Sequence, residues 1–142
     1  MKILVATDGS KNALRAVKYA ARLAHLLRTA SNKITLISVH DDTGLRHAKA
    51  LVGRAEVADY LRELSEKELQ PARKLLQGDG IGYDMEIRTG HVAQEIVDCA
   101  SKGKFDMIVL GSKGRSAVAD LLMGSVAQRV LATAEQPVVL VK

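Results

Sequence analysis

Three glycines near the C-terminal end of the chain have a spacing that suits a bound anion. Gly111, Gly114 and the pair Gly124-Ser125 form the pattern G-x2-G-x9-G-S. Glycine allows the backbone to approach a ligand closely and to adopt positive φ angles. The pattern follows an apolar run and precedes a helical one, so it joins a strand to the start of a helix. Free backbone N–H groups at such a junction attract phosphate, which is the chemistry that we expect here.

The residues beside these glycines add donors and positive charge. We expect the N–H groups of Gly124, Ser125 and Val126 at a helix start, where the helix dipole favours an anion by about 0.3–1 kcal/mol. The Ser125 hydroxyl either donates to the phosphate or only caps the helix. Lys113 and Arg115 either contact the phosphate or are ordinary surface charges.

The sequence contains no standard catalytic set. The P-loop pattern, the dinucleotide-binding pattern G-x-G-x-x-G and the nucleophile elbow G-x-S-x-G are all missing. Cys99 falls on an apolar helical side, which indicates a core thiol. The histidines lack a metal-ligand spacing, although one of them follows a strand and is a candidate for the mouth of the site; they are His25, His40, His47 and His91. Efficient turnover is therefore not expected.

Composition favours one globular domain over residues 1–142. The net charge is +5, but the basic residues are scattered and the aromatic residues amount to 3%, so nucleic acid is not an expected partner. A single cysteine allows no internal disulfide. No apolar run reaches the ~18 residues of a membrane span, and the N-terminal run is too short for a signal-peptide core. We expect a cytoplasmic protein without membrane contact.

Strand and helix patterns alternate along the chain and predict an α/β fold. Mostly apolar runs indicate a parallel sheet that is covered by helices on both faces. The expected strands are 3–6, 34–39, 83–88, 106–110 and 138–141. Helices are expected from a Ser10 N-cap to about 27, from 57 to 77 with a kink or restart at Pro71, from 92 to 100 and from 126 to 134, with a loop between 41 and 53.

Two of the expected strands have distinct patterns. The run 83–88 alternates polar and apolar residues, which is typical of a sheet edge. The run 138–141 is apolar and lacks the charges that usually protect an exposed edge. A homodimer that pairs two copies of this strand would cover it; the alternative is that the strand lies inside the sheet or under a helix.

The chain resembles the universal stress protein family, and specifically its ATP-binding branch. The resemblance is carried by the opening segment 3–10, the G-x2-G-x9-G-S spacing and the ending 137–141. It implies a Rossmann-like fold of the adenine nucleotide alpha hydrolase-like kind, with five parallel strands in the order 3-2-1-4-5. It also implies dimers through the last strand, Val138 to Val141. Lys113 stands where the family often has His or Arg, and Thr7 where it often has Val.

The resemblance further implies a set of nucleotide-binding residues. Asp8 would lie near the ribose or a phosphate-bound Mg, although it could instead cap the first helix. Val39 would offer backbone groups to the adenine, although it could be core alone. The full set is Thr7, Asp8, Val39, Leu110, Gly111, Gly114, Arg115, Gly124, Ser125 and Val126.

Three functions are compatible with these residues. The favoured one is a stress-response regulator that binds ATP or AMP, and whose occupied state is recognised by an unidentified protein partner. The second is a slow, metal-dependent ATPase that uses Asp8. The third is a dimeric interaction scaffold that binds no nucleotide, against which the intact glycine pattern argues.

Overall fold

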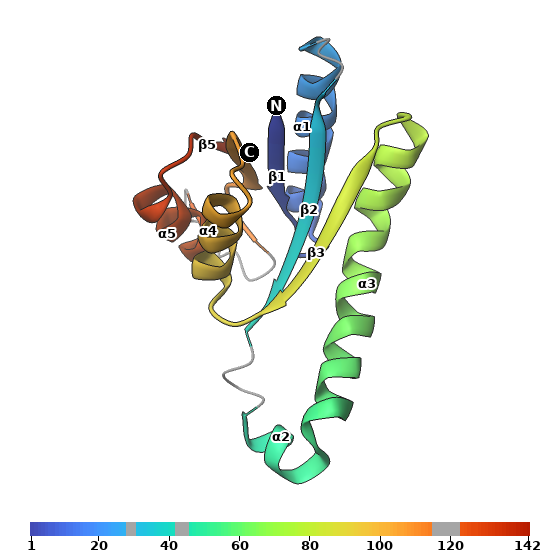
Figure 1. Ribbon diagram of the computed structural model, residues 1–142, viewed down its shortest axis with the longest axis vertical. Helices are drawn as coiled ribbons and strands as arrows, with labels where there is room; N and C mark the ends of the chain where they lie inside the picture. Colours follow the sequence, from blue (N-terminus) through green and yellow to red (C-terminus); the bar gives the residue numbers. More distant parts are fainter. Residues whose placement is uncertain (28–30, 42–45, 115–122) are drawn as a thin grey trace.

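A five-stranded parallel sheet forms the centre of the molecule (Figure 1). The computed structural model describes residues 1–27, 31–41, 46–114 and 123–142, without the side chains of 46–48. Its strand order is β3-β2-β1-β4-β5, which confirms the order 3-2-1-4-5. The strands are β1 (Lys2–Ala6), β2 (Lys33–His40), β3 (Tyr83–Thr89), β4 (Met107–Gly111) and β5 (Val138–Val141).

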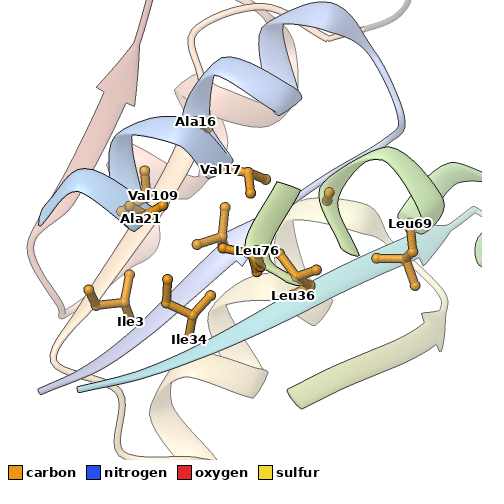
Figure 2. Close-up of a cluster of buried hydrophobic side chains, with 12 residues drawn as sticks. Ile3, Ala16, Val17, Ala21, Ile34, Leu36, Leu69, Leu76 and Val109 are labelled. Atoms are coloured by element: carbon orange, nitrogen blue, oxygen red, sulfur yellow. The ribbon is translucent and has the colours of Figure 1, made fainter. Parts of the chain in front are cut away.

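Helices cover both faces of this sheet (Figure 1). One face packs against α1 (Lys11–Leu26) and α3 (Arg54–Gly78), and Figure 2 shows the apolar cluster between them. The other face packs against α4 (Val92–Lys102) and α5 (Ser125–Thr133). The α/β fold with helices on both faces is therefore confirmed.

The central strand β1 shows why the strands are apolar throughout. Successive side chains of a strand point to opposite faces of the sheet. Ile3 and Val5 belong to the cluster under α1 and α3, whereas Leu4 belongs to the cluster under α4 and α5. All three are fully buried, and burying each contributes about 1.5–3 kcal/mol.

Two expectations about the middle of the chain are wrong, the loop at 41–53 and the restart at Pro71, whereas a kink at Pro71 stays a prediction. A helix, α2 (Arg46–Val52), lies where a loop was expected, because seven residues are too few to show a clear apolar period. Pro71 does not restart α3, which continues from Arg54 to Gly78. Pro71 lies on the exposed side, while Leu69 and Ala72 beside it are buried against the sheet and hold the helix in place.

α2 and the first half of α3 extend past the carboxyl ends of the strands (Figure 1). We call this segment, residues 46–64, the arm. All α3 residues of the buried cluster against the sheet come from the second half of the helix, namely Leu69, Ala72 and Leu76. In the arm, the side chains of Leu51 and Tyr60 are 86% and 60% exposed. Val57 and Leu61 of the arm are buried but belong to neither apolar cluster of the sheet, so the arm packs less on the sheet than the second half of α3 does.

Both expected edge strands lie at the edges of the sheet. β3 pairs with β2, and β5 pairs with β4, each on one side. The alternative that the last strand lies inside the sheet is therefore excluded. Whether two copies pair through β5 stays a prediction.

Candidate functional site

The candidate site lies where the winding of the sheet reverses. β1 and β4 are neighbours, with Ile3 opposite Met107 and Val5 opposite Val109. The chain leaves β1 toward α1 on one face and leaves β4 toward α5 on the other. Ligands of open α/β sheets bind in the crevice outside the carboxyl ends of the strands at such a point.

A cavity of about 200 Å³ occupies this crevice. Nine of the ten residues expected to bind a nucleotide line it: Thr7, Asp8, Val39, Leu110, Gly111, Gly114, Gly124, Ser125 and Val126. The tenth, Arg115, lies outside the described residues. The structure thus brings together residues from the ends of three strands and from one helix start, while their role in binding stays a prediction.

The turn after β1 holds Asp8 at the cavity. The Ser10 amide donates to Asp8 Oδ1 at 2.9 Å, and the Gly9 amide donates to Thr7 Oγ1 at 3.3 Å. The N-cap of α1 is Ser10, whose hydroxyl accepts from the Ala13 amide at 3.1 Å. Asp8 is therefore not the helix cap, and its carboxylate is oriented by the turn instead.

The glycine segment faces this turn across the cavity. A Cβ atom on Gly114 would lie 3.1 Å from Asp8 Oδ2, which is closer than a Cβ atom normally packs, so the glycine allows this approach. A Cβ atom on Gly111 would lie 3.0 Å from the backbone carbonyl carbon of Asn12 in α1. Gly111 therefore allows α1 to approach β4, and Gly114 allows the loop to approach Asp8.

The start of α5 completes the wall of the cavity. Gly124 is its N-cap, so Ser125 is not a cap and its exposed hydroxyl is available to a ligand. The Gly124 amide, expected to be a free donor, instead donates to the Ser112 carbonyl at 2.7 Å. The Ser112 amide in turn donates to the Val141 carbonyl at 2.8 Å. The amides of Ser125 and Val126 at the helix start have no earlier turn to bond to, and they remain the predicted anion donors.

The backbone of Val39 points into the crevice. In a parallel strand, successive residues direct their N–H and C=O groups to alternate neighbours. The Ile37 carbonyl accepts from the Thr7 amide on the β1 side, and the His40 carbonyl accepts from the Gly90 amide on the β3 side, both at 2.9 Å. Val39 therefore directs its groups to the β1 side, where the pairing with β1 has ended at Ala6. The N–H donor and the C=O acceptor of Val39 therefore face the position that β1 would occupy if it continued past Ala6.

The sequence reasoning missed the apolar part of the cavity. It is lined by small and branched side chains: Ala6, Ala13, Ile37, Val92, Ile96 and Ala127. Val92 and Ile96 have the period of a buried helix face, so the pattern alone does not separate them from the core. Lys113 also lines the cavity, whereas the sequence alone did not distinguish a phosphate contact from an ordinary surface charge at this position.

Other candidate residues lie away from the cavity lining. Cys99 is 3% exposed, and burial raises the pKa of its thiol, which confirms a core cysteine. The His40 side chain contacts Glu68 of α3, with Nε2 and Oε2 3.0 Å apart. His25 and His91 are exposed, and the side chain of His47 is not described. The described part of the chain holds no group of three or more His, Cys, Asp or Glu residues that could hold a metal ion.

This arrangement defines an α/β protein of the adenine nucleotide alpha hydrolase-like fold. The chain belongs to the universal stress protein family, whose model matches residues 1–142.

Relatives support the assignment along the whole chain. Universal stress protein MJ0531 of Methanocaldococcus jannaschii is 34% identical over 142 residues, which cover 99% of this chain and 81% of the relative. The solved structure of MJ0577 from the same organism has a TM-score of 0.84 at 27% identity and covers 99% and 94% of the two chains. A universal stress protein solved in complex with cAMP has a TM-score of 0.64 at 26% identity, covering 100% and 97%.

Proposed function

We propose that this protein binds an adenine nucleotide, ATP or AMP, in the cavity between the β1 turn and the glycine segment. The observation that carries the proposal is the convergence of nine motif residues, far apart in the sequence, on one cavity at the switch point. The complex of a family member with cAMP supports an adenine nucleotide as the ligand class. Occupancy would order the glycine segment, and a protein partner in a stress response would recognise that state.

The chemistry of the cavity fits the parts of such a ligand. The apolar wall of Val92 and Ile96 suits a base, and the Val39 backbone offers it one donor and one acceptor. The amides of Ser125 and Val126, with the side chains of Ser125 and Lys113, suit the phosphates. Asp8 is the residue that would reach a Mg ion carried by the phosphates. Arg115 would add a cation from the segment between the glycines.

Binding is favoured over catalysis. Asp8 Oδ1 already accepts a hydrogen bond from the Ser10 amide, which suits a carboxylate that positions a ligand. Hydrolysis of ATP would also require a positioned water and neutralisation of the phosphate charge. Slow hydrolysis through Asp8 is the second candidate, because Asp8 lies against Gly114 where the phosphates would pass. An Asp8→Asn variant that still binds ATP but loses the slow hydrolysis would support this second candidate.

The surroundings of the domain are also part of the proposal. We expect a cytoplasmic homodimer through Val138–Val141, with no nucleic acid and no membrane as partner. Among the described residues, no helix has the length and apolar character needed to cross a bilayer.

The decisive experiment is calorimetric titration of nucleotide-free protein with ATP and Mg. At Gly114 even a Cβ atom would lie 3.1 Å from Asp8 Oδ2, and Val adds two more carbons there. We therefore expect Gly114→Val to lower the affinity at least tenfold, about 1.4 kcal/mol. Gly82→Val is the matched control, because a Cβ atom there meets nothing within 4 Å. Circular dichroism should report the same fold for both variants. A folded, nucleotide-free wild type that binds neither ATP nor AMP would overturn the proposal.

A further inference from the structure

The buried face of α3 contains two polar residues among apolar ones. Leu61, Leu69 and Leu76 are buried, and Ser65 and Glu68 lie between them in the same buried stripe. The Glu68 side chain is 7% exposed. A carboxylate is rarely buried this far unless it is paired, so its partner is informative.

One partner of Glu68 is the side chain at the end of β2. His40 Nε2 lies 3.0 Å from Glu68 Oε2, which is an ion-pair distance, but His40 Nε2 makes no hydrogen bond with a described residue. The His40 side chain is 17% exposed. Buried pairs of this kind are often no more stabilising than apolar residues of the same volume. The hydroxyls of Ser38 and Ser65 on the facing surfaces are buried and make no hydrogen bond with any described residue. A polar contact of this kind is therefore not required for core stability.

The contact lies beside the backbone groups that face the cavity. His40 directly follows Val39, so the Val39 carbonyl and the His40 amide belong to one peptide unit. This end of β2 has no β1 neighbour, because the pairing with β1 ends at Ala6 and Ile37. It is held on the β3 side by the Gly90 amide, which donates to the His40 carbonyl at 2.9 Å. Glu68 supplies the second anchor from the helix layer, through the side chain.

We infer that His40 and Glu68 are positioning residues for the base half of the site. They lie outside the cavity lining and act through the Val39 peptide, whose orientation they fix from the opposite face of the sheet. This inference rests on the proposed nucleotide function and adds a residue pair that the motif spacing does not include. It separates the site into a base half that depends on α3 and a phosphate half that depends on the start of α5.

The test compares two ligands on the same variants. Glu68→Ala removes the anchor, so the affinity for ATP should fall roughly 3- to 10-fold, as expected from weakening one or two hydrogen bonds. Inorganic tripolyphosphate, which has no base, should bind the variant and the wild type equally. Glu68→Gln keeps the shape and an oxygen acceptor for the imidazole, and it should restore most of the ATP affinity. His40→Ala combined with Glu68→Ala should lose no more than the worse single variant.

Two control variants separate positioning from general loosening of the helix. Ala72→Gly lies one turn further along α3 and weakens the helix while both side chains of the pair are retained. Ser65→Ala removes a neighbouring buried hydroxyl that makes no hydrogen bond within the described part of the chain. Both should retain the wild-type ratio of ATP to tripolyphosphate affinity. In the ligand-free full chain, hydrogen exchange of the Gly90 amide should accelerate in Glu68→Ala and stay unchanged in Ser65→Ala.

The outcomes distinguish the two proposals. A wild type that binds no ATP overturns the nucleotide function and this inference with it. A wild type that binds ATP, together with a Glu68→Ala variant of unchanged affinity, overturns the positioning role alone. Equal losses for ATP and tripolyphosphate, or equal losses in Ala72→Gly, also overturn it, because they indicate general destabilisation.

Discussion

Gly111 and Gly114 belong to one spacing but have different neighbours. A Cβ atom on Gly111 would meet the main chain of Asn12, which is fixed within α1, whereas one on Gly114 would meet the end of the Asp8 side chain. Main-chain atoms of a helix cannot move aside as a side chain can. The first glycine is therefore required for packing and the second for access to the cavity.

This difference is testable by the same substitution at both positions. Gly111→Ala should lower the free energy of unfolding by about 1–3 kcal/mol, which is typical of overpacking. Gly114→Ala should leave it within about 0.5 kcal/mol, because the contact is with a side chain that can shift. Urea denaturation of the two variants measures both values. Equal stability of the two variants would show that α1 adjusts to the added methyl group.

At this scale the sequence predicts the polar part of the site and not its apolar part. Glycine spacing and residues at strand ends are local signals, and they identified nine residues that now line one cavity. Val92 and Ile96 have no such signal, because a buried cavity wall and a core face share the same helical period. The direction of the Val39 backbone follows from where β1 ends beside it, which is a property of the assembled sheet.

At the scale of elements, α3 is longer than the sheet that it covers. Its 25 residues span about 37 Å, whereas the eight residues of β2 span about 26 Å. All its residues in the core cluster with the sheet come from the second half. Sequence reasoning located this helix by its apolar period, yet the restart that it allowed at Pro71 follows from a local rule that packing on either side overrides.

The two halves of α3 should therefore differ in local stability. Amides of 54–64 should exchange at least tenfold faster than amides of 66–76, because the buried residues Val57 and Leu61 lie outside the cluster on the sheet, whereas the second half of α3 packs into that cluster. Hydrogen exchange followed by mass spectrometry resolves the two segments. α4, which packs against the other face of the sheet, serves as the protected reference. Equal protection along α3 would mean that the arm unfolds only with the rest of the domain.

At the scale of the whole molecule, β5 is the last strand of the sheet and pairs with β4 alone among the described strands. The carbonyls of Pro137 and Val141 accept from Ile108 and Ser112 of the β4 side. By the alternation of a parallel strand, the N–H group of Leu140 therefore points outward. An outward donor is available to a strand of a second copy.

Leu140→Pro removes that donor without removing a bond to β4. If the dimer forms through β5, the variant should shift toward monomer by at least tenfold in the dissociation constant, about 1.4 kcal/mol. Leu140→Ala loses the same packing but keeps the N–H group, so it should remain mainly dimeric. Sedimentation or light scattering over a range of concentrations measures the shift. A wild type that is monomeric throughout would contradict assembly through this edge.

Ser112 belongs to both the edge and the site. Its amide bonds to the end of β5, and its carbonyl holds the Gly124 amide at the start of α5. A partner strand that orders β5 would thus also order the wall at which we propose that the phosphates bind. By thermodynamic linkage, nucleotide would then strengthen assembly by the same factor as assembly strengthens nucleotide binding. The amount of this protein in the cell would itself help to set how much nucleotide it holds.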